Sequence, residues 1–324
     1  MQAAVVFKWG GPEVLEYVEV PDPVPRTGEV IVELMASSVN YHDILVRSTG
    51  RGLPLPSILG IDGVGRRRDT GEEVIILPAL YWGDRDDCFG DDFQVLGDAT
   101  DGTYSELIRV PSENLFPKPQ SLSWEEAAAL PVAGLTAYRA LFTRGRLRAG
   151  ESVIVLGAGS GVSTFAVSLA VAAGAQVYVT SSSPEKIVRS QELGATGGVL
   201  YTDAGWTEEL RNQTRGGADL VIDGVGSALD ESLRCLRRGG RVVVFGATGG
   251  STASLSVPSL YFGQYSILGT TSGNGREFAE LIKSVDRDRW RPVVDSTRPL
   301  AEVGAAHARM EERAHFGKMV LLNR

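Results

Sequence analysis

A glycine-rich turn lies near the middle of the 324-residue chain, between a predicted strand and a predicted helix. Gly157, Gly159 and Gly161 directly follow the apolar run 153–156, and an alanine-rich stretch comes next. Glycines let the chain turn tightly and let a pyrophosphate approach the backbone N–H groups at a helix N-terminus, where the helix dipole favours anions. The run departs from the usual glycine pattern at its end, where it has Ser163, which is small enough for close packing of helix against sheet. We therefore predict dinucleotide binding here rather than an ordinary turn at the start of a helix.

The end of the next predicted strand distinguishes between the two nicotinamide dinucleotides. NAD-specific folds usually place Asp or Glu about 20 residues beyond the glycines, where it accepts hydrogen bonds from the ribose hydroxyls. Here that position is Ser181, followed by Ser182 and, in the next predicted helix, by Lys186. Hydroxyl donors and a positive charge suit a 2′-phosphate, which a carboxylate would repel. The segment predicts NADPH as the cofactor, and the alternative is a polar loop in which a serine caps the following helix.

The elements that position this turn follow from the pattern of apolar residues. Up to about residue 119 short β-like runs are interrupted by Pro and Gly, as in an irregular β-rich domain. From about residue 125 strand and helix signals alternate, as in a parallel sheet covered by helices. Six strands of a doubly wound sheet are predicted there, at 152–156, 176–180, 198–201, 220–223, 241–245 and 267–271. Helices are predicted at 164–173, 184–193, 228–236 and 300–312, and a last strand at 317–322.

Composition limits the functions open to this chain. Its length exceeds what one hydrophobic core usually serves, and 43% hydrophobic with 22% charged residues is ordinary for a globular protein. The 32 basic and 40 acidic side chains give a net charge of −8 without a dense basic block, which argues against nucleic-acid binding. Two isolated cysteines argue against a disulfide scaffold, and the apolar run at residues 1–8 is too short for a signal segment or a membrane span. We expect a cytoplasmic protein.

With these motifs placed, the chain resembles the medium-chain dehydrogenase/reductase superfamily, and within it the quinone oxidoreductase-like and polyketide-type enoyl reductase branches. The similar segments, in the family's order, are 10–15, 38–43, 60–65, 101–106, the turn at Gly157 and 317–321. They extend over nearly the whole chain. The resemblance implies an α/β protein: a GroES-like β-rich catalytic domain formed by residues 1–122 and 272–324, and a Rossmann doubly wound domain formed by residues 123–271.

Position in the predicted sheet and the resemblance together indicate which residues contact the cofactor. Gly246 and Ala247 follow the fifth predicted strand, at the edge where doubly wound sheets bind ligands. Tyr201 is expected on the adenine side, and Thr136 near the ribose or phosphate, unless it only begins a helix. The complete expected set is Thr136, Gly157, Gly159, Ser160, Gly161, Val162, Ser181, Ser182, Lys186, Tyr201, Gly246, Ala247, Thr270 and Lys318.

Departures from the family pattern limit the chemistry. Zinc-dependent members place Cys, His and Cys or Asp at positions that here are Asn40, Ile61 and Val132, and a catalytic zinc needs three such ligands. The segment 81–98, which in some members carries four cysteines, contains only Cys88. Without a Lewis acid to stabilise an alkoxide, alcohol dehydrogenation is unattractive. Hydride transfer to a small electrophile remains, either a quinone or an activated alkene such as an enone, enal or enoyl thioester.

Two polar residues are the candidates for catalysis. Tyr41 lies in an Asn-Tyr-x-Asp context in which similar enoyl reductases have a proposed proton donor, and Asn40 is expected to line the substrate site. The Tyr41 phenol would either protonate an enolate carbon or donate a hydrogen bond to a carbonyl oxygen; the alternative is a packing tyrosine. If it protonates carbon, Tyr41→Phe should slow alkene reduction more than quinone reduction. His42 is interpreted as a lone histidine without an acidic group to orient it, and it is expected to be structural or solvated.

Further expectations concern assembly and function class. The last predicted strand of the sheet, 267–271, is apolar and would leave an exposed edge, so we expect a homodimer. No membrane or nucleic-acid partner is expected. Because no side chain is unambiguously catalytic, a non-catalytic NADPH-binding structural or regulatory protein and an alcohol dehydrogenase-like enzyme remain alternatives to a reductase.

The first testable prediction is that the protein binds no stoichiometric zinc, because Asn40, Ile61 and Val132 supply no metal-ligand cage. Elemental analysis of protein purified without chelators should show well under one zinc per chain. Stoichiometric zinc whose removal abolishes activity would contradict the prediction.

Overall fold

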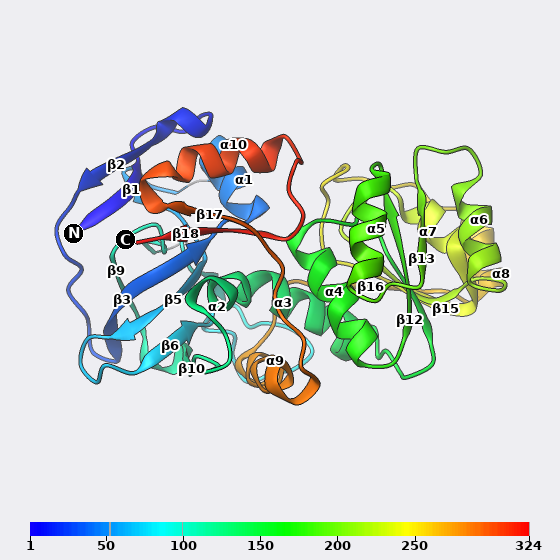
Figure 1. Cartoon of the computed structure of the whole chain (residues 1–324), viewed down its shortest axis with the longest axis horizontal. Helices are drawn as coiled ribbons and strands as arrows, with labels where there is room; N and C mark the ends of the chain where they lie inside the picture. Colours follow the sequence, from blue (N-terminus) through cyan, green and yellow to red (C-terminus); the bar gives the residue numbers. More distant parts are fainter. Residues whose placement is uncertain (52, 99, 324) are drawn as a thin grey trace. The chain divides into compact units, whose positions relative to one another are not determined.

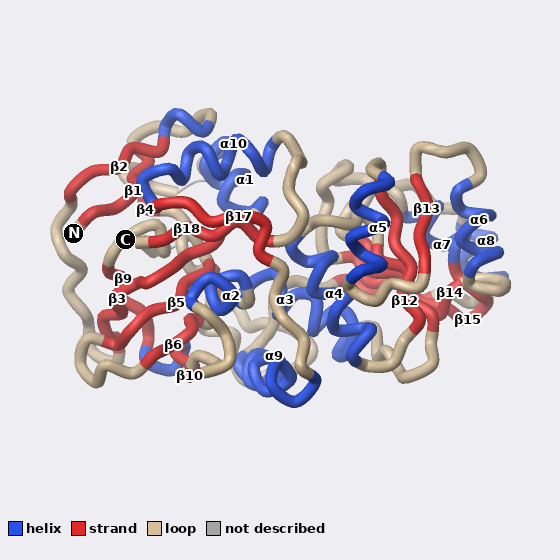
Figure 2. Tube along the Cα trace, viewed as in Figure 1, coloured by secondary structure: helices blue, strands red, loops and turns tan. Residues whose placement is uncertain are grey.

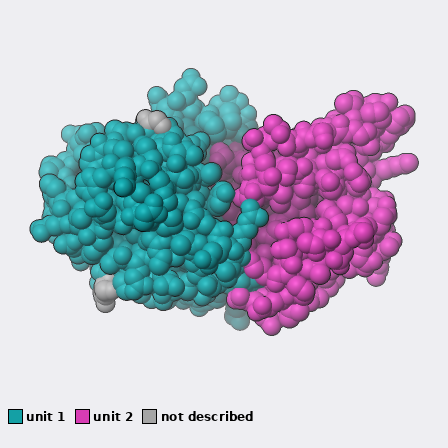
Figure 3. All heavy atoms as spheres, turned by 90° about the horizontal axis from the view of Figure 1, so that it is seen from above, with its two compact units in different colours: residues 1–135, 273–324 teal, residues 136–272 magenta. Residues whose placement is uncertain are grey.

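The computed structural model describes residues 1–51, 53–98 and 100–323, which form two compact units. Unit 1 contains residues 1–135 and 273–324, and unit 2 contains residues 136–272 (Figures 1 and 3). Both ends of the chain therefore belong to unit 1, as the resemblance implied. The two units are described separately below.

Unit 1 is built on a seven-stranded, mostly antiparallel sheet with the N-terminal and C-terminal parts of the chain side by side. The strands run in the order β10-β6-β5-β3-β18-β17, with β9 also paired to β3. Their bounds are β3 (Glu29–Ser38), β5 (Asp62–Arg67), β6 (Glu73–Ile76), β9 (Leu107–Pro111), β10 (Leu115–Pro117), β17 (Val294–Pro299) and β18 (Lys318–Leu322). The β3–β18 pairing sets Val320 opposite Ser38, which brings the C-terminal strand beside the segment that leads to Asn40.

Smaller elements complete unit 1. A three-stranded sheet joins β1 (Gln2–Val6) to β2 (Leu15–Glu19) and β4 (Ser57–Ile58), and β7 (Ala79–Leu80) pairs with β8 (Gln94–Val95). The helices are α1 (Tyr41–Thr49), α2 (Trp124–Ala129), α3 (Pro131–Tyr138, which continues into unit 2), α9 (Gly275–Asp288) and α10 (Val303–Glu311). Asn40 and Asp43 form the capping box that begins α1, and Gly50 ends it in the left-handed conformation.

Unit 2 is a six-stranded sheet in which every pairing is parallel. Figure 2 shows its strands in red and its helices in blue. The order is β13-β12-β11-β14-β15-β16, with bounds β11 (Ser152–Val155), β12 (Gln176–Ser181), β13 (Gly197–Leu200), β14 (Ala218–Asp223), β15 (Leu236–Val244) and β16 (Ser266–Gly269). The helices are α4 (Gly161–Ala172), α5 (Pro184–Glu192), α6 (Trp206–Gln213), α7 (Leu229–Cys235) and α8 (Val257–Gly263). All six predicted strands exist, and the predicted doubly wound fold is confirmed.

The element boundaries differ from the sequence prediction in a few places. Strand β15 begins earlier than predicted, because Leu236 already pairs with Ala218 of β14, ahead of a register shift. Strand β16 ends at Gly269, not at residue 271. The compact units divide at 135/136, whereas the resemblance implied a boundary at 122/123, because α2 packs against β3, β5 and β18 of unit 1.

Two further expectations concern cysteines and membranes. Cys88 and Cys235 are free thiols, and burial raises the pKa of Cys235 to about 12. Within residues 1–51, 53–98 and 100–323, no helix combines the length and apolar character needed to span a bilayer.

A buried hydrogen-bonded chain joins α1 to α10 inside unit 1. Arg47 Nη1 lies 3.3 Å from His307 Nδ1, and His307 Nε2 lies 3.1 Å from the Tyr104 hydroxyl. Tyr104 donates to Asp43 Oδ2 at 2.9 Å. Arginine can only donate, so His307 accepts at Nδ1 and carries its hydrogen on Nε2, directed at Tyr104. The neutral ring therefore fits this chain.

We predict that His307 makes the protein sensitive to acid. Burial, assisted by the charge of Arg47, lowers the pKa of His307 to about 3. As the pH falls below 6.5 the unfolded chain gains a proton at His307 that the native protein does not, so stability is lost. Relative to His307→Gln, the free energy of unfolding of the unmodified protein should fall by about 2 kcal/mol between pH 7 and pH 5. Urea unfolding of both proteins at both pH values gives the measurement, in which other titrating groups cancel; a difference independent of pH would contradict it.

Candidate active site

The glycine-rich turn of unit 2 joins β11 to α4 and is held against the end of β12. Gly157 and Gly159 have φ angles of +72° and +102°, a left-handed conformation that favours glycine. The N–H of Ala158 donates to the Thr180 carbonyl at 2.7 Å, and that of Gly157 donates to Thr180 Oγ1 at 3.2 Å. Thr180 thus fixes the turn, a role that sequence reasoning missed.

Two serines complete the turn and leave donors for a ligand. Ser160 Oγ accepts from the Ser163 N–H at 3.1 Å and caps α4, while Ser163 Oγ donates to the Gly157 carbonyl at 2.9 Å. Ser163 therefore closes the turn by a hydrogen bond as well as by its small size. The N–H groups of Gly161 and Val162, the first two of α4, have no acceptor in the described part of the chain. This N-terminus fits a pyrophosphate.

In the serine-rich segment at the end of β12, one serine caps the next helix and another is exposed and can bind a ligand. Ser183 caps α5 by accepting from the Lys186 N–H at 3.4 Å, and buried Ser181 accepts from the Ser183 N–H at 3.0 Å. Helix capping thus accounts for Ser183. Ser182 is exposed to solvent. Tyr201, 44% exposed, lies beside Ser181, whose carbonyl accepts its N–H at 3.0 Å. Four residues are predicted to contact the 2′-phosphate and the adenine. Ser181, Ser182 and Lys186 belong to this segment, and Tyr201 follows the adjoining end of β13.

The remaining predicted cofactor residues in unit 2 follow other strands of the sheet. Gly246 and Ala247 come after β15, and a Cβ on Gly246 would lie 2.9 Å from the Gly224 carbonyl oxygen after β14. Thr270 follows β16 and donates its N–H to the Val244 carbonyl at 3.0 Å. Since parallel strands end at one edge, these loops share that edge with the glycine-rich turn. Thr136 instead lies buried in α3.

In unit 1, the positions that hold zinc in other members converge on a buried carboxylate, Asp62. Asp62 Oδ1 accepts from the Val132 N–H at 2.8 Å. Asp62 Oδ2 accepts from Ser38 Oγ at 2.7 Å and from Asn40 Nδ2 at 2.8 Å. Asn40 and Val132 therefore contact one carboxylate, and Ile61 is the residue that precedes it in the chain. Sequence reasoning did not single out Asp62.

Lys318 completes this cluster. Its ammonium, 2% exposed, donates to Asp62 Oδ2 at 3.0 Å, Asn40 Oδ1 at 2.6 Å and the Val39 carbonyl at 2.9 Å. All three hydrogens are therefore used inside unit 1, which leaves none for the cofactor contact expected of Lys318. Its geometry instead fixes the Asn40 amide and neutralises Asp62. In the described ranges, no group of three or more His, Cys, Asp or Glu side chains is arranged to hold a metal.

The start of α1 presents two ring side chains beside this cluster. Tyr41 is 41% exposed. His42 Nε2 lies 2.7 Å and 2.9 Å from the two carboxylate oxygens of Asp98. The expectation that His42 lacks an acidic partner was therefore wrong; Asp98 is 56 residues away in sequence. Burial favours the neutral ring, but the hydrogen bond that the ring donates to Asp98 and the negative charges of Asp98 and Asp43 outweigh it and raise the pKa of His42.

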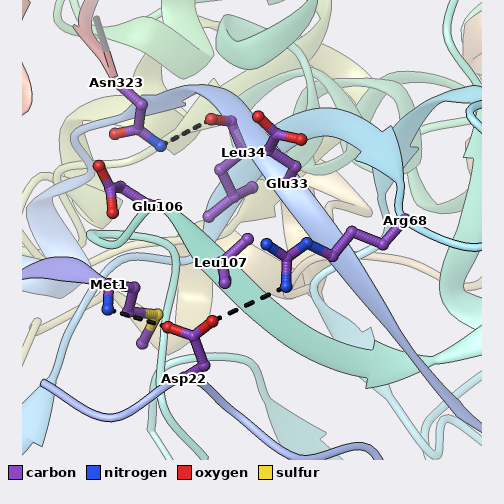
Figure 4. Close-up of a pocket in the computed structure, with 8 residues that line it drawn as sticks. All are labelled: Met1, Asp22, Glu33, Leu34, Arg68, Glu106, Leu107 and Asn323. Carbon is purple, nitrogen blue, oxygen red and sulfur yellow. Dashed lines mark hydrogen bonds and ion pairs between the residues drawn. The ribbon is translucent and has the colours of Figure 1, made fainter.

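A separate pocket of about 250 Å³ lies elsewhere in unit 1 (Figure 4). Its polar lining includes Asp22, which pairs with the Met1 ammonium at 2.9 Å and with Arg68 at 3.7 Å. Glu106 and Asn323 are also in its wall. None of the predicted site residues lines this pocket, so we do not assign the active site to it.

A Rossmann unit with a phosphate-binding turn, together with a β-rich unit formed by both ends of the chain, defines a nicotinamide-dependent dehydrogenase or reductase. Two protein-family models match: the alcohol dehydrogenase GroES-like domain over residues 26–120 and the zinc-binding dehydrogenase model over residues 161–287. The chain belongs to the medium-chain dehydrogenase/reductase superfamily, as the sequence indicated, and its β-rich unit is GroES-like.

Relatives cover essentially the whole chain. Quinone oxidoreductase of Mus musculus is 31% identical over 99% of this chain and 98% of its own. Acryloyl-coenzyme A reductase of Metallosphaera sedula is 29% identical over 98% and 99%. A crystal structure of an NAD-dependent alcohol dehydrogenase is 37% identical with a TM-score of 0.95 and covers 100% of both chains. The quinone oxidoreductase of Thermus thermophilus, also solved as its NADPH complex, is 33% identical with a TM-score of 0.82 and covers 99% and 100%.

Proposed function

We propose that this oxidoreductase uses NADPH to reduce a quinone or an activated alkene, without zinc. The observation that carries the proposal is the combination, in unit 2, of the unpaired N–H groups at the start of α4 with serines, and no carboxylate, at the end of β12, followed by Lys186. Relatives named for quinone and acryloyl-coenzyme A reduction support the reaction class. The substrate is a small electrophile.

Unit 2 supplies the residues that would hold NADPH. The Gly161 and Val162 N–H groups would bind the pyrophosphate, and Ser182 and Lys186 the 2′-phosphate. Tyr201 would contact the adenine. When bound, the cofactor supplies the hydride.

Unit 1 supplies the substrate side in this proposal. Asn40 is held by Asp62 and Lys318 with both ends of its amide used, so it shapes the site as a rigid polar wall. Tyr41 is exposed at the start of α1, where its hydroxyl can donate to a substrate carbonyl. Zinc independence is supported by Lys318, because its buried ammonium already neutralises the carboxylate nearest the three positions.

Turnover tests this function directly. NADPH oxidation should proceed steadily with quinones or 2-alkenals, followed by the absorbance of the reduced nicotinamide. Binding of NADPH without turnover across such a panel would favour a non-catalytic protein, and reduction of NADP⁺ by simple alcohols would favour an alcohol dehydrogenase-like enzyme.

Cofactor preference gives a second test. A charge-assisted contact to the 2′-phosphate should contribute about 1.5–3 kcal/mol, or at least about tenfold in affinity. Lys186→Ala should therefore weaken NADPH binding by that factor and leave NADH binding nearly unchanged, as measured by titration. Lys283→Ala, which removes a lysine paired with Glu280 on α9, is the matched control. Equal affinities of the unmodified protein for both cofactors, or equal losses in Lys186→Ala, would contradict the NADPH assignment.

We also propose a homodimer formed through the β16 edge of unit 2. Strand β16 ends the sheet, and Ile267 on it is 36% exposed. On α8, Tyr261 and Phe262 are 58% and 72% exposed, so the edge is flanked by apolar surface. A second copy related by two-fold symmetry would pair with the β16 edge and cover the apolar surface beside it. Light scattering at micromolar concentration should give twice the chain mass of 34.6 kDa, and Ile267→Lys should lower it; a monomeric unmodified protein would refute the dimer.

A further inference from the structure

The His42–Asp98 pair is positioned beside the Asn40–Asp62 cluster by two independent contacts of unit 1. His42 is two residues beyond Asn40 on the first turn of α1. On the other side, Gly97 packs so closely on the segment before Asp62 that a Cβ there would lie 2.6 Å from the Gly60 carbonyl oxygen. Leu96 is buried in the core cluster that contains Ile61. The pair therefore lies next to the positions at which other family members bind their catalytic metal.

The two ring nitrogens of His42 have different surroundings. Nε2 faces both oxygens of Asp98, which fixes the orientation of the ring. Nδ1 has no hydrogen-bond partner among the described residues. The His42 side chain is 28% exposed and that of Asp98 is 25% exposed, so a ligand or water can reach the ring. An oriented ring with one unused nitrogen is the arrangement of a general acid or base.

We propose that His42, oriented by Asp98, is the acid that protonates the substrate carbon after hydride transfer, which makes an α,β-unsaturated carbonyl compound the substrate class. This inference rests on the proposed reductase function and assigns to His42 the proton transfer considered above for Tyr41. Tyr41 then donates a hydrogen bond to the carbonyl oxygen.

The step balances without a metal. Hydride from NADPH forms a C–H bond at the β-carbon, and the alkene π electrons move to the α-carbon and carbonyl oxygen as an enolate. The Nδ1–H bond of the imidazolium breaks as a C–H bond forms at the α-carbon. NADP⁺, the saturated carbonyl compound and neutral His42 result, with the remaining hydrogen on Nε2 directed at Asp98. Water returns the proton to Nδ1 before the next turnover.

The charges around His42 favour the imidazolium that this step requires. Asp98, from the segment after β8, and Asp43, on α1, both stabilise it, whereas Arg51 just beyond α1 opposes it. Alkene reduction needs the protonated ring, so its rate should fall as pH rises through the pKa of His42. Replacing Asp98 by Asn removes a negative charge and should move that fall to lower pH.

The test compares four variants, His42→Gln, Asp98→Asn, Tyr41→Phe and His315→Gln. Their kcat and kcat/KM are measured as functions of pH, with 2-alkenals and with quinones. His42→Gln keeps an amide that can hydrogen-bond Asp98 but cannot donate a titrating proton. Its kcat on alkenals should drop by about 100-fold or more, and its pH profile should lose the fall that His42 causes. Quinones, whose product oxygens take protons from water, should be affected far less. Asp98→Asn should shift the profile, and His315→Gln, outside the site, is the matched histidine control.

Each outcome decides the proposal. Equal losses on both substrate classes would mean that His42 only positions α1, and retained alkenal turnover in His42→Gln would exclude it as the acid. If Tyr41→Phe selectively lost activity on alkenals and His42→Gln lost none, Tyr41 and not His42 would be the proton donor. An unmodified protein that oxidises NADPH with quinones alone would keep the reductase function and refute the His42 step, whereas no turnover with either class would refute both.

Discussion

The buried ion pair between Lys318 and Asp62 is the interaction on which the substrate side of unit 1 depends. Each charge is almost completely removed from water, which costs several kcal/mol unless the partner and further hydrogen bonds offset it. Here Lys318 makes three hydrogen bonds, and Asp62 accepts from Lys318, Ser38, Asn40 and the Val132 backbone. Removal of either charge would leave the other buried and unpaired. The pair therefore holds the C-terminal strand, the segment before α1 and the start of α3 in one arrangement.

This arrangement supports the proposed zinc independence. In zinc-dependent members three side chains around a divalent cation impose the local geometry. In this chain a protein ammonium lies in the same cluster and imposes it instead, through a short contact to Asn40 and the pair with Asp62. A lysine gives order and charge neutralisation but no open coordination position, so it cannot polarise a substrate as a Lewis acid does. In the proposed zinc-free reaction, an acid needed for turnover must come from neighbouring side chains.

The sequence predicted what depends on local patterns. The six strands of unit 2, the glycine-rich turn and the capped helices follow from residue periodicity and from glycines within a few residues. Pairings between distant residues were out of reach: Lys318 is 256 residues from Asp62, and Asp98 is 56 residues from His42. Lys318 was accordingly expected at the cofactor and His42 was expected to lack a carboxylate. The hydrogen-bond partner of a hydroxyl could not be predicted either. Ser163, for example, donates to the Gly157 carbonyl only once the turn is formed.

The cost of burying a polar group without a hydrogen-bond partner also decides which polar residues are structural and which can bind a ligand. A buried hydroxyl or carboxylate must find partners within the fold, and Ser181, Ser163 and Asp62 all do. Side chains with exposure and unused hydrogen-bonding capacity are the ones that can still bind a ligand. His42 belongs to this second group because only one of its nitrogens is held, and the carboxylate that holds it also favours its charged form. The partly exposed His42 ring, beside the rigid Lys318–Asp62–Asn40 cluster, is therefore the group that can still donate a proton to a substrate.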